Sequence, residues 1–420
     1  MKPNRPVYIA GGAHTPYIGK GHPDFIWKKH PDFGTRNNPT IEEHMSKATL
    51  EALEVAGATP AQIERGFVGN FAAQTFVSQG HLGAMAARIH PGLAGKPWTR
   101  LEAACASGGI AVVSACEALQ AGYDVALVLG AEVQTTVSAR QGADYLARAS
   151  HYESERAIDE FTFPAMFARR WKIYQETYGA TEADLAHVVA KAYGNANRNP
   201  FAHMCAQKRT LEWASEAGDR NPRFLQNEEL HDYMKVSDCS QVTDGASALV
   251  LATEEGLKKL GRATADCAQL LSWGLASGPL GQVDDYRTMK TTQQAASEAL
   301  SDAGIGHSDV GILEVHDCFA VTEWLMLEAL GFASAGAAPA LSKNGDTAIE
   351  GRLPVNTGGG LIGFGHPVGA TGVKQLIEVW RQMKGQCGDY QVPNPPTHGV
   401  TANMGGDDRT TVVTVLQNCA

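Results

Sequence analysis

The sequence predicts an α/β protein assembled from two related halves. Residues 51–69 align without a gap on residues 298–316, and Gly57 then falls on Gly304. Each copy has the pattern of an amphipathic helix, a glycine at the helix end, a polar loop and an apolar strand. With 420 residues, 44% of them hydrophobic and 19% charged, the chain is long enough to bury two such cores.

A second pair of matching segments follows the repeat. Cys105-Ala-Ser-Gly-Gly109 opens a helical stretch that ends at Gly122, and residues 368–372 open another that ends at Gly385. In the first copy, the apolar run at 125–130 then reads as a strand. Strands and helices therefore alternate in both halves, which is the arrangement expected of α/β sheets whose catalytic loops meet at one seam.

These repeats divide the chain into three parts. Residues 1–130 and 265–420 are predicted to be the N-terminal and C-terminal halves. Residues 131–264 have more charged and aromatic residues and a helical pattern, as expected of an inserted lid or substrate-binding region. Because no low-complexity linker separates the parts, we expect one compound domain.

Composition excludes several classes of function. The formal net charge of -10 argues against a general nucleic-acid-binding protein. The eight cysteines include no CxxC pair, which favours a reducing compartment and a catalytic role for any special cysteine. The N-terminus lacks the apolar core of a signal peptide, and no run has the length of a membrane span. We therefore expect a cytoplasmic protein that does not insert into a membrane.

Cys105 is the first candidate for catalysis. It follows Leu101-Glu-Ala-Ala and precedes Ala-Ser-Gly-Gly, so it lies at a strand-to-helix turn among small residues. A helix N-terminus favours thiolate and offers free backbone N–H groups to an oxyanion. The alternative is a small cysteine that only packs in the core, which is how we interpret Cys116 in the same helix.

A glycine-rich loop at 356–372 carries the second candidate, His366. Its glycines permit tight turns and close approach to a ligand, and Pro367 restrains the backbone of His366. A phosphate-binding loop is a competing interpretation, but the stretch lacks the Lys-Ser/Thr ending of a P-loop and the strand-linked GxGxxG of a dinucleotide fold. An imidazole of ordinary pKa here could take the proton of Cys105.

His316-Asp317-Cys318-Phe319 supplies a second imidazole and a second thiol at the end of a repeated apolar strand. The ends of strands are where α/β sites gather. A metal site is the alternative for His, Asp and Cys together, but neighbouring residues of an extended chain point to opposite faces and no complementary ligand cluster is evident. We therefore predict no metal; taken alone, the tetrapeptide also fits a buried core.

Together, the Cys105 loop, the Gly365-His366-Pro367 loop and the duplicated body resemble the thiolase superfamily over nearly the whole chain. The sequence His316-Asp-Cys-Phe319 is similar to the sterol-carrier-protein type of thiolase, whereas most thiolases have Asn-Glu-Ala-Phe there. The resemblance implies a thiolase-like fold in which duplicated α/β halves form a five-layered αβαβα core with an inserted loop region.

One departure from that resemblance concerns the second acid/base. Ordinary thiolases have a Cys-x-Gly motif near the C-terminus, but this chain has Asn403-Met-Gly405-Gly. The resemblance implies that Cys318 replaces the missing thiol and that the Gly405 amide remains an oxyanion donor beside the Cys105 amide. It also implies that His366 and, through water, His316 stabilise an enolate oxygen.

The implied activity is reversible thiolytic cleavage of a 3-oxoacyl-CoA, or the reverse Claisen condensation, through an acyl group on Cys105. Coenzyme A would be a cosubstrate, with no permanently bound cofactor. Ser240 matches a family segment whose serine contacts the pantetheine arm, although a turn serine is an equal interpretation. The segment 70–88 resembles a dimer interface, so a homodimer, or a dimer of dimers, is expected.

Two alternatives remain open at the level of sequence. One is a condensing or carbon–carbon lyase relative with a specialised substrate; the presence of Cys105 favours acyl transfer over this. The other is a non-catalytic thiolase-like subunit, against which the joint presence of both imidazoles and both thiols argues. The basic residues of the insert fit either solvated surface or contacts to coenzyme A phosphates, and solvated surface is the default for each: Arg169, Arg170, Lys208 and Arg209.

Overall fold

A computed structural model describes residues 1–419 of the chain. Its nine strands are β1 (Val7–His14), β2 (Arg65–Gly69), β3 (Trp98–Leu101), β4 (Val125–Glu132), β5 (Gly245–Ala252), β6 (Ala268–Ser277), β7 (Val310–Glu314), β8 (His398–Gly405) and β9 (Thr410–Asn418). The helices of the two halves are α1 (Ile41–Ala56), α2 (Ala73–Phe76), α3 (Leu82–Arg88), α4 (Ser107–Gln120), α10 (Glu254–Leu260), α11 (Lys290–Ala303), α12 (Ala320–Ala329), α13 (Ala338–Lys343), α14 (Gly360–Gly363) and α15 (Thr371–Met383). The helices between β4 and β5 are α5 (Ala139–Leu146), α6 (Tyr152–Glu155), α7 (Thr162–Tyr178), α8 (Glu182–Ala196) and α9 (Leu211–Ser215).

The strands form one sheet in the order β3-β2-β4-β5-β1-β6-β9-β8-β7. Outward from the β1–β6 junction, the two arms have the same arrangement: β5 and β9 are antiparallel to their neighbours, and β2 and β7 are parallel to β4 and β8. A parallel bridge between Leu313 and Val355 stands where the second arm would have its counterpart of β3. The duplication predicted from the repeat is therefore present in the strand pairing.

The repeated helices have the same ends in both halves. Helix α1 ends at Gly57 with φ 65°, and α11 ends at Gly304 with φ 70°. Both are left-handed C-cap glycines, a conformation that costs a residue with a Cβ. The aligned glycines of the sequence repeat therefore stop equivalent helices before equivalent strands, β2 and β7.

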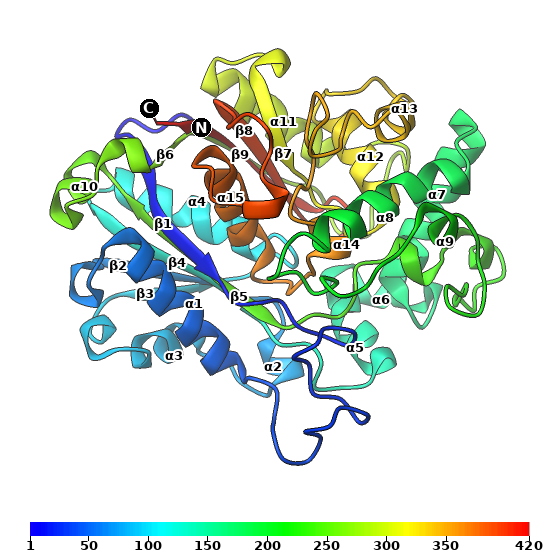
Figure 1. The fold of residues 1–420 in the computed structure, drawn as a ribbon, viewed down its shortest axis with the longest axis horizontal. Coiled ribbons are helices and arrows are strands. Elements are labelled where there is room, and N and C mark those ends of the chain that lie inside the picture. Colours follow the sequence, from blue (N-terminus) through cyan, green and yellow to red (C-terminus); the bar gives the residue numbers. More distant parts are fainter. Residues whose placement is uncertain (420) are drawn as a thin grey trace.

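Five layers result from how the helices cover this sheet (Figure 1). Helices α1, α3 and α10 pack on the outside of the N-terminal arm, and α11 packs on the outside of the C-terminal arm. Between the arms lie α4, which contacts β2, β4 and β8, and α15, which contacts β5, β7 and β8. The predicted αβαβα arrangement is confirmed, with one addition: its two β layers are the arms of one continuous sheet, joined where Val7–Ile9 pairs with Ala268–Leu270.

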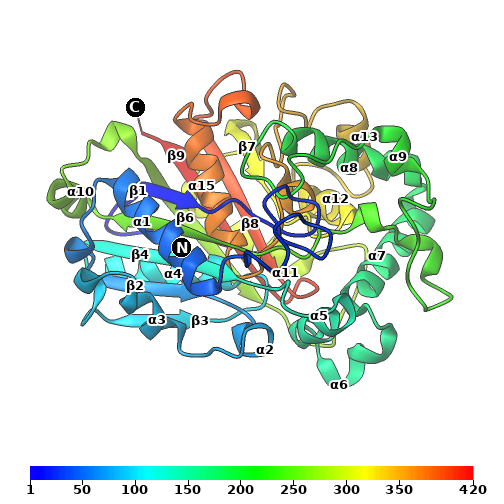
Figure 2. The same cartoon turned by 60° about the horizontal axis from the view of Figure 1, so that its bottom comes forward.

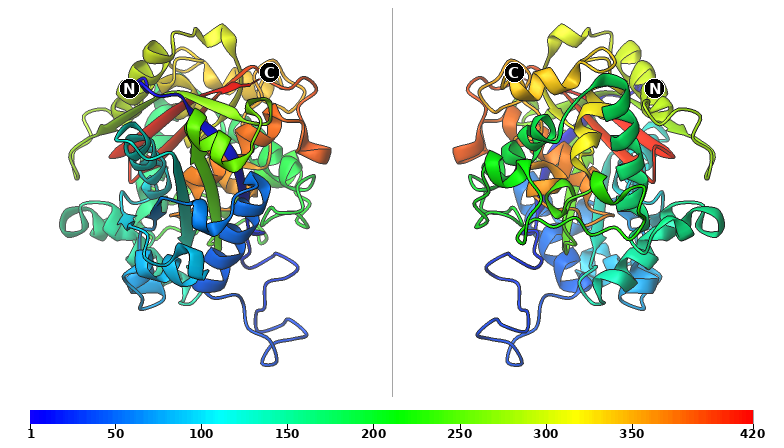
Figure 3. Two further views of the ribbon diagram at one scale, coloured as in Figure 1. Left: turned by 90° about the vertical axis from the view of Figure 1, so that its left-hand side faces the viewer. Right: turned by 90° about the vertical axis from the view of Figure 1, so that its right-hand side faces the viewer.

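The helices α5 to α9 gather at one end of the molecule, away from the strands (Figure 2). The C-terminal end of the predicted insert, residues 131–264, lies in the N-terminal arm instead, because β5 pairs with β1 and β4 there. We therefore propose that the inserted part ends before Gly245. The segment between β1 and α1 extends as a loop from the body (Figure 3). Within residues 1–419, the helices are too short or too polar to cross a bilayer.

Candidate active site

The backbone before α4 aims Cys105 into the space between the two arms. Ala104 has φ 50°, a left-handed conformation that is uncommon for a residue with a Cβ. The Ser107 hydroxyl closes the turn, since it donates to the Ala104 carbonyl at 2.6 Å and accepts from the Ala103 N–H at 3.0 Å. Cys105 therefore precedes a helix N-terminus, as the sequence predicted, and Cys116 is buried in the core as expected.

His366 follows a position, Gly365, that only glycine can occupy without strain. Gly365 has φ 115°, and a Cβ on it would lie 2.8 Å from the side chain of Thr243. The His366 carbonyl accepts from the Gln134 side chain at 2.9 Å, and its ring Nδ1 lies 2.7 Å from the Thr371 hydroxyl. These contacts hold the imidazole in place at the start of α15.

His316 lies just past the end of β7, fully buried. Its Nδ1 lies 3.3 Å from the side-chain amide nitrogen of Asn403. The next residue, Asp317, accepts a 2.6 Å hydrogen bond from the Leu361 N–H, which joins this loop to the glycine-rich loop of His366. Two segments that are distant in sequence are thereby fixed against each other.

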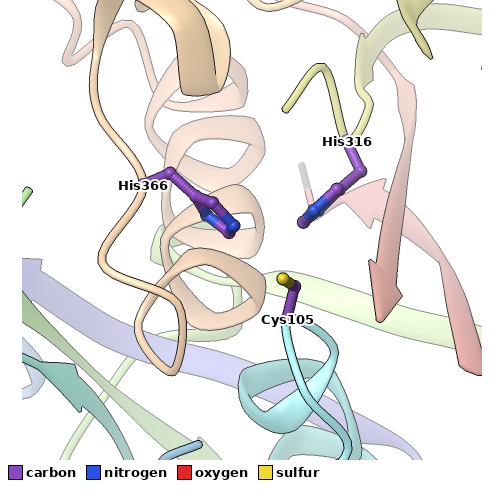
Figure 4. Close-up of side chains that lie close together, drawn as sticks. All are labelled: Cys105, His316 and His366. Atoms are coloured by element: carbon purple, nitrogen blue, oxygen red, sulfur yellow. The ribbon is translucent and has the colours of Figure 1, made fainter. Parts of the chain in front are cut away.

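The sulfur of Cys105 and one ring nitrogen each of His316 and His366 lie within 4.8 Å of one another. The two rings meet edge to face, with centroids 5.0 Å apart and planes at 86°. Both imidazoles turn toward the sulfur (Figure 4). In the part of the chain that the structure describes, the Nε2 atoms of His316 and His366 are buried without a hydrogen-bond partner, so both are available to a bound substrate.

Cys318 lines the same pocket as Cys105. Its sulfur lies 3.9 Å from the Thr322 hydroxyl, and its carbonyl accepts from the Ser240 N–H at 2.9 Å. The two thiols predicted to work together therefore share one cavity.

The Cys318 sulfur does not belong, within residues 1–419, to the group of three ligand atoms that lie closest together. It is nevertheless near enough that a charge on Cys105 would raise the pKa of the Cys318 thiol. This separation suits a group that acts on a bound substrate rather than on Cys105 itself. Both thiols line one pocket rather than opposite faces of the molecule, as a joint role requires.

The backbone amide at the Cys105 sulfur comes from Gly406, one residue beyond the predicted Gly405. The Gly406 N–H lowers the pKa of the Cys105 thiol, which places this amide beside the sulfur, and Gly406 lines the pocket. Gly405 instead closes β8, where it pairs with Thr410 of β9. The turn after the strand, with Gly406 at φ 65°, is what presents the later amide to the thiol. The role assigned to Gly405 thus passes, in our proposal, to Gly406.

Burial sets the acid–base state of all four side chains. It raises the pKa of Cys105 to about 12, although the Gly406 N–H works in the opposite direction, and it raises the pKa of Cys318 well above the ordinary thiol value. Burial also lowers the pKa of His366 to about 3 and that of His316 well below 6.5. Because desolvation disfavours charge, the resting site holds neutral thiols and neutral imidazoles.

The pocket over Cys105 has a volume of about 420 Å³. Ser240 lines it, and its N–H bonds the Cys318 carbonyl, so the predicted binding residue stands beside the second thiol. Most of the wall is apolar and comes from the insert and neighbouring loops, including Phe71, Leu146, Phe161, Phe163, Phe224, Val236 and Phe319. Such a wall suits an apolar ligand whose orientation is set by a few polar groups.

The thiol and two imidazoles also have the composition of a zinc site with an open fourth position. Sequence reasoning considered a metal only for His316-Asp317-Cys318. Asp317 is engaged with the Leu361 N–H instead, so the group that could hold a metal is Cys105, His316 and His366. The absence of a metal from the working protein stays a prediction.

Two contacts at the site were missed by sequence reasoning. Asn403 was noted only as a replacement for a cysteine, yet its side chain bonds both the Cys105 carbonyl and His316. Arg170 was interpreted as solvated surface, which is wrong: its side chain is buried and paired with Asp407, next to Gly406. Neither partner is near in sequence, so only a family alignment or a structure could have revealed them.

Two family descriptions match the chain. "Thiolase, N-terminal domain" matches residues 31–255, and "Thiolase C-terminal domain-like" matches residues 276–418. An acetyl-CoA acetyltransferase of Methanothermobacter thermautotrophicus is 33% identical over 380 residues, which cover 90% of this chain and 94% of that protein. The benzoylsuccinyl-CoA thiolase subunit BbsB of Thauera aromatica is 30% identical over 413 residues, 97% of each chain.

Solved structures share the fold at lower identity. An Ltp2-ChsH2(DUF35) aldolase superimposes with a TM-score of 0.77 at 21% identity, covering 100% of this chain and 99% of that one. Human mitochondrial 3-ketoacyl-CoA thiolase in complex with CoA gives a TM-score of 0.71 at 17% identity, covering 100% of both chains. At these sequence identities, the structural similarity shows only that the duplicated fold is shared.

Proposed function

The chain belongs to the thiolase family and is an acyltransferase, and we propose that it cleaves 3-oxoacyl-CoA thioesters, or forms them in reverse, through an acyl group carried on Cys105. The observation that carries this proposal is the convergence of the Cys105 sulfur with the ring nitrogens of His316 and His366 within 4.8 Å. A second thiol, Cys318, lines the same pocket.

In the first half-reaction, the Cys105 sulfur attacks the 3-keto carbon while His366 Nε2 takes the thiol proton. The Nδ1–H of His366 can then bond the Thr371 hydroxyl, whose own proton has the Pro367 carbonyl 3.2 Å away as an acceptor. The bond between C2 and C3 breaks, and its electron pair forms the enolate of acetyl-CoA. The Cys318 thiol protonates that enolate at C2, so acetyl-CoA leaves and the acyl group stays on Cys105.

In the second half-reaction, coenzyme A replaces acetyl-CoA in the pocket. The Cys318 thiolate takes the proton of the coenzyme A thiol, and the resulting thiolate attacks the acyl carbonyl on Cys105. The bond from that carbonyl to the Cys105 sulfur breaks, and the sulfur regains its proton from His366. Each proton that left in the first half has then returned, and acyl-CoA is released.

Two sets of donors serve the two oxyanions. The amides of Cys105 and Gly406 face the sulfur and suit the oxygen of the thioester intermediate. The unpartnered Nε2 atoms of His316 and His366 suit the enolate oxygen. Both sets adjoin the largely apolar pocket, and in such surroundings one such donor contributes about 3–4 kcal/mol to lowering a barrier.

Coenzyme A is the proposed cosubstrate, with Ser240 at its pantetheine arm beside Cys318. Related structures that contain coenzyme A support the cosubstrate. We further propose a cytoplasmic homodimer, or a dimer of such dimers, formed around 70–88, acting in lipid or fatty-acid metabolism. The insert would shape the acyl pocket, because its phenylalanines supply much of the apolar wall.

A substrate assay with a cysteine variant tests this proposal. Acetoacetyl-CoA and a medium-chain 3-oxoacyl-CoA are incubated with the protein, with and without coenzyme A, and loss of the thioester is followed. Cys105→Ser should abolish the reaction, while Cys205→Ser, which changes a half-buried cysteine outside the pocket, should leave it unchanged. Full activity of the Cys105→Ser variant would refute acyl transfer through this residue.

A further inference from the structure

The side-chain amide of Asn403 has one orientation that its surroundings permit. Its Oδ1 accepts from the Gly109 N–H at 3.0 Å, and its Nδ2 donates to the Cys105 carbonyl at 3.0 Å. If the amide were turned over, its N–H₂ group would face the Gly109 N–H, donor against donor. Its oxygen would face the Cys105 carbonyl, acceptor against acceptor. Asn403 is only 2% exposed, so water cannot relieve either clash. The hydrogen bonds therefore identify which atom is nitrogen.

The second hydrogen of Nδ2 is directed at His316. The amide nitrogen carries two hydrogens and has two acceptors within reach, the Cys105 carbonyl and His316 Nδ1 at 3.3 Å. An N–H donor facing Nδ1 requires a lone pair there. In a neutral imidazole the proton then resides on Nε2, which is the buried atom of His316 that has no partner among residues 1–419.

We propose that Asn403 is a positioning residue that holds His316 as an Nε2–H donor, and thereby keeps the Cys105–His316–His366 group from binding a thiophilic divalent cation. The inference rests on the proposed function, in which His316 donates to an enolate oxygen. A nitrogen that carries a proton is a donor to an oxyanion but cannot ligate zinc. The side-chain amide of Asn403, through the tautomer of His316, would thus decide whether the same three side chains serve acyl transfer or bind a metal.

The substitution Asn403→Asp reverses the polarity of the atom that faces His316 while preserving side-chain size. The carboxylate still accepts from the Gly109 N–H, but its other oxygen now favours Nδ1–H on His316. That tautomer places a lone pair on Nε2, and a carboxylate behind a histidine is the usual support of a zinc ligand. The variant should lose acyl transfer and gain a metal site made of Cys105, His316 and His366.

Cobalt binding measures this gain without any acyl-CoA. Co²⁺ is titrated into wild type, Asn403→Asp and the double variant Asn403→Asp/His316→Gln, and the thiolate-to-cobalt absorption is followed. Asn403→Asp should bind about 10- to 100-fold more tightly than wild type, the size of effect that such outer contacts have on metal affinity, and the double variant should lose the gain. In the same variant, Zn²⁺ should protect Cys105 from alkylation. Equal binding by wild type and a folded Asn403→Asp variant would overturn the proposal.

The tautomer can also be observed in the unaltered protein, which covers the case in which the aspartate, facing the Cys105 carbonyl, prevents folding. Protein labelled with ¹⁵N-histidine is compared with its His316→Gln variant to assign the ring signals of His316. We expect an unprotonated Nδ1 and a protonated Nε2; the opposite pattern would overturn the proposal. Neither measurement uses substrate, so a protein that lacks thiolase activity but shows this tautomer would challenge the proposed function alone.

Discussion

The thiol of Cys105 and the imidazole of His366 face each other under an apolar pocket, and burial favours the uncharged form of both. The pKa of Cys105 is raised to about 12 and that of His366 is lowered to about 3. At neutral pH, which lies between these two pKa values, the Cys105 thiol and the His366 imidazole are therefore both uncharged in the free protein. In the proposed mechanism, proton transfer to His366 therefore accompanies attack on the substrate, when the amides and imidazoles gain an oxyanion to stabilise.

A pH profile of alkylation tests this charge state. A thiol whose pKa is raised stays protonated at neutral pH, so its thiolate fraction increases about tenfold for each pH unit below that pKa. The rate at which iodoacetamide modifies Cys105 in the substrate-free protein should rise from about pH 6 to about pH 9 without a plateau. A plateau near neutral pH would mean that Cys105 rests as a thiolate paired with an imidazolium.

Substitution of the second thiol separates acyl transfer from nucleophile reactivity. The Cys318→Ala variant lacks the group that we propose protonates the departing enolate, so turnover should fall by about 10²–10⁴-fold. Cys105 should still be alkylated at the wild-type rate. Cys239→Ala is the matched control, because Cys239 lines the same pocket but bonds Met234 and Lys235 within its own segment. Rapid turnover by Cys318→Ala would mean that another group is the second acid/base.

At the scale of elements, one buried charge pair joins the insert to the loop after β8. Arg170 of α7 pairs with Asp407 and also donates to the carbonyls of Tyr286 and Thr288, at 2.8 and 3.0 Å. The next residue, Asp408, accepts from the N–H groups of Thr291 and Thr292 at the start of α11. The Gly406 amide is thus held at the Cys105 sulfur from two sides.

Removal of the arginine should therefore affect both stability and rate. Arg170→Met leaves Asp407 buried without its partner, which costs about 3–5 kcal/mol of unfolding free energy, and it releases the Gly406 amide. Denaturant unfolding measures the first effect and turnover measures the second. Arg169→Met is the control, since Arg169 is half-buried and lies over the Tyr286 ring at 4.1 Å without an ion pair in the described structure. Equal stability of the two variants would contradict this role for the pair.

Local patterns predicted the elements that depend on local chemistry. The helix-capping glycines Gly57 and Gly304, the strands that follow them and the turn at Cys105 all follow from the residues themselves. The edge-to-edge joining of the two arms could not be predicted, because it depends on three residue pairs between β1 and β6. The burial of Arg170 was hidden for the same reason, since its partner lies in the other half of the chain.

At the scale of the whole molecule, the duplication places the proposed catalytic groups at the seam between the halves. The N-terminal half supplies Cys105 at the start of α4, and the C-terminal half supplies His316, Cys318 and His366. Helices α4 and α15 pack side by side between the two arms of the sheet, so their N-terminal loops meet. Sequence motifs identified these four residues as candidates, whereas their separation, and our proposal that Gly406 rather than Gly405 is the amide donor, required the three-dimensional arrangement.

The covalent intermediate is the central claim, and peptide mapping by mass spectrometry tests it most directly. The protein is incubated with a 3-oxoacyl-CoA in the absence of coenzyme A, quenched in acid and digested. We predict that the acyl mass is found on the peptide that contains Cys105 and disappears when coenzyme A is added before the quench. Consumption of the substrate with no acyl group on Cys105, or with the group on Cys318, would contradict the account.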